Sequence, residues 1–169
     1  MPLVPTPSWS EDELAQSAET ARNIFRDERI QEPIETYSDY FEQYRDFVEN
    51  ILEESEDLKN LADVVEDYIT DDDNRYALRY LASPAISDDD LRVLAEAKFS
   101  KKALEDDPDS VRRIVETVIA VHDRQRLPWV GENREPTDEE RRTAVIATTA
   151  LIASSRAQTH RRTNAKELQ

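Results

Sequence analysis

Glycine and cysteine are nearly absent from this 169-residue chain, and each absence excludes a class of site. Gly131 is the only glycine, which excludes both the glycine-rich loop that binds phosphates and the Gly-Xaa-Ser-Xaa-Gly turn of serine hydrolases. Because there is no cysteine, disulfides, thiolate zinc sites and cysteine nucleophiles are excluded as well. The two histidines form no metal-binding His-Glu-Xaa-Xaa-His motif, since His122 ends an apolar stripe and His160 lies among arginines.

Long hydrophobic runs are missing too. The longest, residues 144–153, is interrupted by Thr148 and Thr149 and is about half as long as a bilayer crossing requires. The first residues, Met1 to Pro5, lack the basic and apolar stretches of a signal peptide. We therefore expect a cytoplasmic protein with no membrane partner.

Acidic side chains dominate the charge. The net charge is −16, and lysine is scarce beside arginine. An acidic excess of this kind is typical of proteins that work in concentrated salt, where screening removes self-repulsion, so we expect an extreme halophile. The charge is also uneven: residues 1–90 carry 7 basic and 25 acidic side chains, a balance of −18, whereas residues 91–169 carry 15 and 13, a balance of +2.

The residues that are abundant predict helices. Hydrophobic residues make up 38% and charged residues 36%, and apolar side chains recur at helical spacing without any clear strand. The prediction is an all-α fold, an irregular bundle of about seven helices over residues 10–160, after an extended lead over residues 1–9. Two capping boxes and three single caps mark helix starts: Ser10 to Glu13, Thr137 to Glu140, Asp71, Ser87 and Asp107.

Pro33 is expected in the first turn of a second helix, whose apolar stripe runs from Ile34 to Leu52. The stripe is rich in aromatic residues, which could stack on nucleic-acid bases. Its helical spacing and the acidic residues on the opposite face favour packing in the core instead.

Two acidic motifs suggest metal chemistry, and both have a simpler interpretation. The run Asp71 to Asp73 lacks the spaced ligands and the glycine of a calcium loop, so capping is favoured. Glu96 and Lys98, with acidic residues 88–90 upstream, match part of the PD-(D/E)XK nuclease motif. That motif needs both side chains on one face of a strand, whereas a helix is predicted here, and positions two apart in a helix point about 200° from each other. The sequence therefore supports no catalytic or metal residue in this chain.

The end of the chain collects basic residues on a predicted helix that starts at Thr137 and meets no glycine or proline. The candidate DNA-binding residues are Arg156, Arg161, Arg162 and Lys166, because guanidinium and ammonium groups on one side of a helix bind phosphates. The same groups could pair with the helix C-terminus or with the acidic half of the protein, and charge alone does not decide between these interpretations.

Four stretches of the chain, taken in order, carry a resemblance to a known family. They are Arg79 to Ser87 followed by Asp89 to Leu91, Arg126 to Val130, Arg134 to Thr137, and the Ala/Thr-rich helix that leads into Arg161 and Arg162. Together they resemble the XamI-type restriction endonucleases, from about Trp9 to the last residue.

The resemblance implies a type II site-specific endonuclease that cuts double-stranded DNA with Mg2+ in a restriction-modification system and acts as a homodimer. It implies a PD-(D/E)XK nuclease core after a helical N-terminal region, with residues 161–169 as the basic start of that core. This chain is then truncated before the catalytic residues, or works with a separate nuclease-core polypeptide, and alone should not cleave. The alternative is a non-enzymatic helical protein-interaction module. A small DNA-binding regulator is disfavoured because a net charge of −16 repels phosphate.

Overall fold

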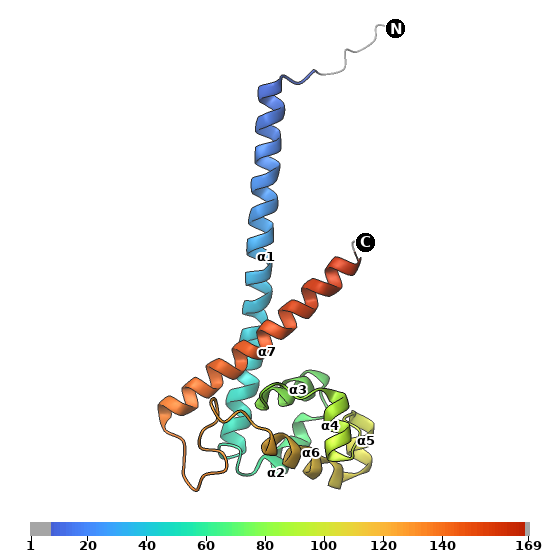
Figure 1. Ribbon diagram of the computed structural model, residues 1–169, viewed down its shortest axis with the longest axis vertical. Helices are drawn as coiled ribbons and strands as arrows, with labels where there is room; N and C mark the ends of the chain where they lie inside the picture. Colours follow the sequence, from blue (N-terminus) through green and yellow to red (C-terminus); the bar gives the residue numbers. More distant parts are fainter. Residues whose placement is uncertain (1–7, 168–169) are drawn as a thin grey trace. The chain divides into compact units, whose positions relative to one another are not determined.

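The computed structural model describes residues 8–167, and within this range every regular element is helical. An isolated antiparallel bridge joins Ala82 to His122. The elements in order are α1 (Glu11–Glu54), α2 (Leu61–Tyr68), α3 (Asp72–Leu78), the 3-10 turn η1 (Arg79–Leu81), α4 (Asp88–Ala95), α5 (Lys101–Asp106), α6 (Pro108–Ala120) and α7 (Asp138–Glu167) (Figure 1). The predicted all-α fold is confirmed. Most of the lead predicted over residues 1–9 lies outside the described residues.

The chain divides into two compact units, and the boundary falls between Thr36 and Tyr37, inside α1. The described part of the first unit is the N-terminal stretch of α1. It begins at the predicted capping box, where the Glu13 amide donates to Ser10 Oγ and the Ser10 amide donates to the Glu13 carboxylate, both at 3.1 Å. This helix start is confirmed.

The helix start predicted at Pro33 is wrong, because α1 continues through Pro33. A proline has no amide proton, so the carbonyl four residues earlier loses its hydrogen bond, which costs about 3 kcal/mol in a helix interior. The glutamates and the glutamine around Pro33 are good helix formers, and no glycine lies nearby to end the helix. A single proline therefore interrupts the hydrogen bonding without ending the helix.

The second unit is built around α6, which contacts α2, α4, α5 and η1. Its apolar face buries Val111, Ile114, Val115 and Val118. The last turns of α1 add five more core side chains: Tyr44, Phe47, Val48, Ile51 and Leu52. The stripe predicted from Ile34 onward is therefore a core stripe in these last turns, whereas Ile34 itself is 52% exposed.

Side-chain caps start the short helices as predicted. Asp71 Oδ1 accepts hydrogen bonds from the amides of Asp73 and Asn74 at the start of α3. Ser87 Oγ accepts from Asp90 at α4, and Asp107 Oδ1 accepts from Asp109 at α6. Each cap satisfies amides that have no partner within the helix, which locates the helix starts.

The longest helices, α1 and α7, both carry many charged residues. Among the described residues, no helix combines the length and the apolar character that a membrane crossing needs.

Candidate nucleic-acid interface

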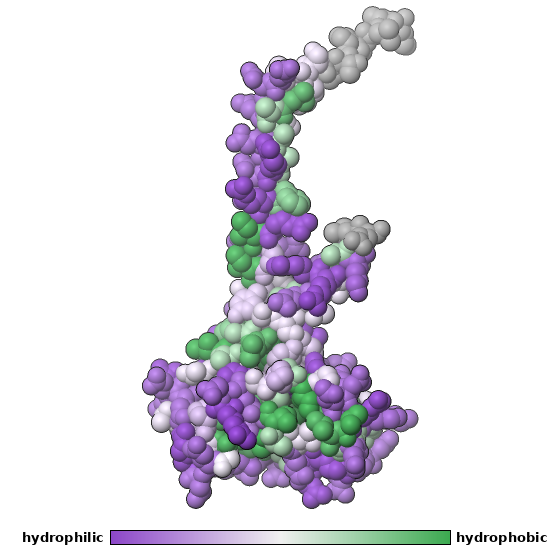
Figure 2. All heavy atoms as spheres, viewed as in Figure 1, coloured by the Kyte–Doolittle hydropathy of each residue, from purple (hydrophilic) through white to green (hydrophobic). Residues whose placement is uncertain are grey.

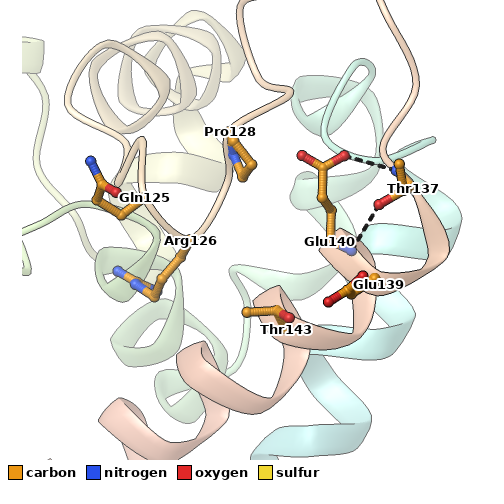
Figure 3. Close-up of a pocket in the computed structure, with 7 residues that line it drawn as sticks. All are labelled: Gln125, Arg126, Pro128, Thr137, Glu139, Glu140 and Thr143. Atoms are coloured by element: carbon orange, nitrogen blue, oxygen red, sulfur yellow. Dashed lines mark hydrogen bonds between the residues drawn. The ribbon is translucent and has the colours of Figure 1, made fainter.

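The candidate DNA-binding residues lie on α7, and a capping box fixes the start of this helix. The Glu140 amide donates to Thr137 Oγ1 at 3.1 Å, and the Thr137 amide donates to Glu140 Oε1 at 2.9 Å (Figure 3). Arg134 holds the same carboxylate with both terminal nitrogens, at 2.7 Å and 2.8 Å. The hydrogen bonds from Arg134 and from the Thr137 amide lower the pKa of Glu140 to about 2. The predicted capping box is confirmed, and it also holds the loop before α7.

A left-handed turn between α1 and α2 gives α7 its second attachment. Glu56, Asp57 and Leu58 have φ angles of 52°, 59° and 76°. This conformation costs a residue other than glycine roughly 1–2 kcal/mol, so other contacts must hold the turn. Two such contacts come from the segment around α7. Arg141 binds the Asp57 carboxylate through two hydrogen bonds of 3.0 Å and 2.8 Å, and Trp129 Nε1 donates to the Asp57 carbonyl at 3.0 Å.

Arg126 joins three parts of the second unit from a buried position. Its side chain is 9% exposed, and Nε donates to Asp123 Oδ2 at 2.6 Å while Nη1 donates to Thr148 Oγ1 at 2.7 Å. Nη2 donates to the carbonyls of Tyr80 and Ala82, at 2.7 Å and 3.2 Å. Burial by itself would raise the pKa of Asp123, but hydrogen bonds from Arg126 and from two backbone amides lower it on balance. The guanidinium thus connects η1, the segment before α7 and α7 itself.

Arg156 is attached to the core and lies apart from the other three candidate residues. Its guanidinium carbon lies 3.6 Å from the centroid of the Tyr76 ring, Nε donates to the Tyr44 hydroxyl at 3.0 Å, and Nη2 lies 2.9 Å from Asp73 Oδ1. Burial raises the pKa of Tyr44 to about 12, although the hydrogen bond from Arg156 opposes this shift. These contacts fix α7 against α1 and α3 one to two turns before the basic end.

The neighbouring Ser155 adds to this attachment. Its hydroxyl is hydrogen-bonded to the hydroxyls of Tyr76 and Tyr80, which also lie 3.0 Å from each other. Sequence patterning did not identify this cluster, because tyrosines at helical spacing predict a core face without indicating which polar group completes their hydrogen bonds.

The basic end of α7 is exposed. Arg161, Arg162 and Lys166 are all solvent-accessible and belong to the same uninterrupted helix as residues 138–160. At 100° per residue, Arg162 and Lys166 lie one turn apart on the same face, about 40° from each other, whereas Arg161 points about 100° away from Arg162. The structure therefore brings two of the four candidates together on one face. The domain division predicted after residue 160 falls within this helix and stays a prediction.

Two hollows lie in the second unit, and neither suits a phosphate or a reacting group. The first, of about 170 Å3, is lined by Glu139, by Glu140, whose carboxylate is already bound, and by Arg126, whose guanidinium is already bound to Asp123, Thr148 and two carbonyls (Figure 3). The second, of about 470 Å3, is lined by Glu49, Glu53, Glu56 and Asp57 with one counter-charge from Arg141. Such an acidic lining repels phosphate.

Among the described residues, no group of three or more His, Asp or Glu side chains is arranged to hold a metal ion. Glu96 is the left-handed residue that ends α4, at φ 51°, and Lys98 follows in a non-helical segment. The expectation that this motif lies within a helix is wrong, because the helix ends at Ala95. His122 is half-buried, with Nδ1 at 2.6 Å from the Ile119 carbonyl.

Comparisons with known proteins agree on one family. Residues 59–169 match the family described as XamI restriction endonuclease. The chain is 33% identical, over 172 residues, to the type II restriction enzyme XamI of Xanthomonas campestris pv. amaranthicola. That alignment covers 96% of this chain and 60% of the Xanthomonas protein, so the chain spans about three fifths of the length of this relative. No solved structure matches the chain.

Proposed function

This chain belongs to the XamI restriction endonuclease family, and from that membership we propose that it is the helical N-terminal part of a type II enzyme that cleaves double-stranded DNA with Mg2+. In this proposal the metal-binding carboxylates lie in a part that corresponds to the two fifths of the Xanthomonas relative that the chain does not span. The activity would serve a restriction-modification system in the cytoplasm, with the full-length enzyme acting as a homodimer.

The proposal rests on the attachment of α7 at two points, which leaves its basic end exposed. Its start is fixed by Arg134 and Thr137, and Arg156 fixes it again beside Tyr76. Beyond that point it presents exposed positive charges on a protein of net charge −16. We propose that Arg161, Arg162 and Lys166 contact DNA phosphates, and that Arg156 contributes by holding the helix that carries them.

Binding to a short duplex tests this role. Fluorescence anisotropy with a labelled DNA duplex should show weak, salt-sensitive binding, and the double substitution Arg161→Glu and Arg162→Glu should abolish it. The matched control is the double substitution Arg92→Glu and Arg112→Glu, which changes the same charge at exposed arginines of α4 and α6 and should leave binding within about twofold, as surface changes away from a site do. The slope of log affinity against log salt should fall by about one for each phosphate contact removed. Equal losses in the control and the double variant would contradict the proposal.

Cleavage tests the division between the helical part and the catalytic part. Supercoiled plasmid incubated with the 169-residue chain and Mg2+ should stay intact. Sustained nicking by the chain, lost when EDTA is added, would show that the catalytic carboxylates lie within these residues. A separate polypeptide that carries the remaining family sequence should restore cleavage when the two are mixed.

A second candidate function, a non-enzymatic protein-interaction module, is favoured by one feature of α7. Residues 143–155 carry no charge, and Ile146 and Leu151 on this stretch are 58% and 47% exposed. An uncharged stretch of helix with exposed apolar side chains, on so charged a protein, is typical of a protein contact. If the duplex does not bind at any salt concentration and the mixture with the remaining family polypeptide does not cleave DNA, while Ile146→Glu weakens binding of that polypeptide, the second function is supported.

A further inference from the structure

The N-terminal stretch of α1 exposes an apolar strip that no described residue covers. Every side chain from residue 8 to residue 32 is exposed, including large apolar ones. Trp9, Leu14, Ile24, Phe25 and Ile30 are each between 51% and 61% exposed, and hydrophobic residues recur along this stretch (Figure 2). Leu14 and Phe25 share one face of the helix, whereas Ile30 points about 160° away from Leu14 and Trp9 precedes the helix. Apolar residues on a helix normally pack against another surface, because exposing them to water costs free energy. An isolated helix of this length is also only marginally stable in water.

The apolar face has the same order of large and small side chains from either end. Leu14, Ala18, Ala21 and Phe25 follow one another at three- and four-residue spacing and so share one helix face. The two alanines are at the centre and a large side chain is at each end. If a second α1 lies antiparallel, with its centre opposite residues 19 and 20, each Leu14 meets a Phe25 and each Ala18 meets an Ala21. The small central residues then let the two backbones approach closely.

Charge also favours an antiparallel copy. The first half, residues 11–19, carries Glu11, Asp12, Glu13 and Glu19 and no basic residue, a balance of −4. The second half, residues 20–30, carries three arginines (Arg22, Arg26 and Arg29) and two acidic residues (Asp27 and Glu28), a balance of +1. Glu11 and Arg29 are eighteen residues apart, which is five full helical turns, so they lie on the same side of the strip. In the antiparallel pair each Arg29 lies beside the other copy's Glu11. A parallel copy would place Arg29 beside Arg29 and the acidic halves against each other.

We propose that residues 11–29 of α1 form an antiparallel two-helix interface with a second copy of this chain. The paired stretch is about 27 Å long at 1.5 Å per residue. This interface would serve the homodimer expected for the full-length enzyme. It follows from the sequence and exposure of α1 alone and does not depend on DNA cleavage. Arg29 already lies over the Phe25 ring, at 4.7 Å from its centroid, and Phe25 is nevertheless 57% exposed. The arginine therefore leaves most of the ring available to the partner.

Sedimentation velocity of the full 169-residue chain in concentrated KCl tests the interface. The chain should be a dimer at micromolar concentration. The double substitution Ala18→Glu and Ala21→Glu should weaken dimerisation at least tenfold, because it buries four carboxylates at the centre of the pair. The control, Gln16→Glu and Asn23→Glu, adds the same charge on the opposite helix face and should change dimerisation less than threefold. All four positions are exposed in α1 and glutamate is a good helix former, so folding should be unaffected.

Orientation is tested by disulfide trapping, for which the cysteine-free chain is well suited. In the antiparallel pair two Leu14 residues are about 17 Å apart along the axis, beyond the roughly 7 Å that a disulfide spans. A Leu14→Cys chain should therefore cross-link with a Phe25→Cys chain and not with itself. Self-cross-linking of Leu14→Cys, a monomeric chain at 100 µM, or an unchanged dimer in the Ala18→Glu and Ala21→Glu variant would overturn the proposal. DNA binding and cleavage are measured separately, so failure of the dimer leaves the proposed function standing, and the reverse also holds.

Discussion

At the scale of single residues, Glu140 has two partners at the start of α7. It accepts hydrogen bonds from the Thr137 amide and from both terminal nitrogens of Arg134. Its pKa falls from 4.5 to about 2, so the folded state holds this carboxylate charged where the unfolded chain would protonate it. A lowered pKa of this kind stabilises the fold above pH 4.5, and the contribution is lost as the pH falls towards 2.

Replacing Glu140 by glutamine should therefore lower the thermal midpoint at neutral pH. The difference from the unsubstituted chain should shrink steadily below pH 4.5 and vanish only below about pH 2, where Glu140 becomes protonated in the folded state as well. Thermal unfolding followed by circular dichroism across this pH range measures the effect. Glu139→Gln, an exposed neighbour in the same turn, is the control and should show a much smaller pH-dependent difference. Identical pH profiles for the two variants would contradict the role given to Glu140.

Glu56 shows the opposite situation, a residue whose backbone conformation opposes folding. Its φ of 52° is unfavourable for any side chain with a Cβ, and the side chain is exposed. Glu56→Gly should leave the free energy of unfolding unchanged or raise it by up to about 1 kcal/mol, since relief of strain exceeds the added entropy of the unfolded chain. The control Glu49→Gly, in the right-handed interior of α1, should lower it by about 1 kcal/mol. Urea denaturation of both variants measures the difference, and equal losses would refute it.

At the scale of elements, Arg126 holds η1, the segment from Asp123 and α7 together. Arg126→Ala would leave the Asp123 carboxylate and the carbonyls of Tyr80 and Ala82 without this donor in a buried setting. We expect the free energy of unfolding to fall by about 3–5 kcal/mol, as it does when one partner of a buried ion pair is removed. The exposed neighbour Arg124→Ala should change it by less than about 0.5 kcal/mol. Chemical denaturation compares the two, and a small loss for Arg126→Ala would show that the network is dispensable.

Helix starts could be predicted from the sequence because capping is local. A cap needs only a side-chain oxygen within three residues of a free amide. The five predicted caps that meet this condition are Ser10, Asp71, Ser87, Asp107 and Thr137. Pro33 misled the prediction because proline favours a first turn but is also tolerated inside a helix when its neighbours favour helix strongly.

The candidate site was less predictable because it depends on distant partners. The turn from Glu56 to Leu58 contains no glycine or asparagine, and contacts with residues more than seventy positions away hold it. Arg156 shows the same limit, since charge patterning identified it as basic but could not reveal that Asp73 and Tyr44 lie beside it. The exposure of Arg161, Arg162 and Lys166 is consistent with the prediction that these residues bind DNA, which still awaits measurement.

At the scale of the whole molecule, the net charge of −16 should make folding depend on salt. Carboxylates on a compact surface repel one another, and this repulsion extends about 30 Å at 0.01 M salt but only about 3 Å at 1 M. We expect helicity and the thermal midpoint to rise strongly from millimolar to molar KCl, as measured by circular dichroism. A variant with Glu42→Gln, Glu49→Gln, Glu53→Gln and Asp63→Asn, at net charge −12, should need less salt. Full helicity at millimolar KCl would argue against adaptation to concentrated salt.

The two tryptophans give the protein its own optical probes. Trp129 is 2% exposed and hydrogen-bonded to the Asp57 carbonyl, so its emission should be shifted to short wavelength and protected from iodide quenching. Trp9 is 61% exposed, so it should emit at long wavelength and be readily quenched. One emission spectrum thus reports separately on the interior of the second unit and on the start of α1. Without any attached dye, a titration can show which of these two regions responds when a ligand, salt or another chain is added.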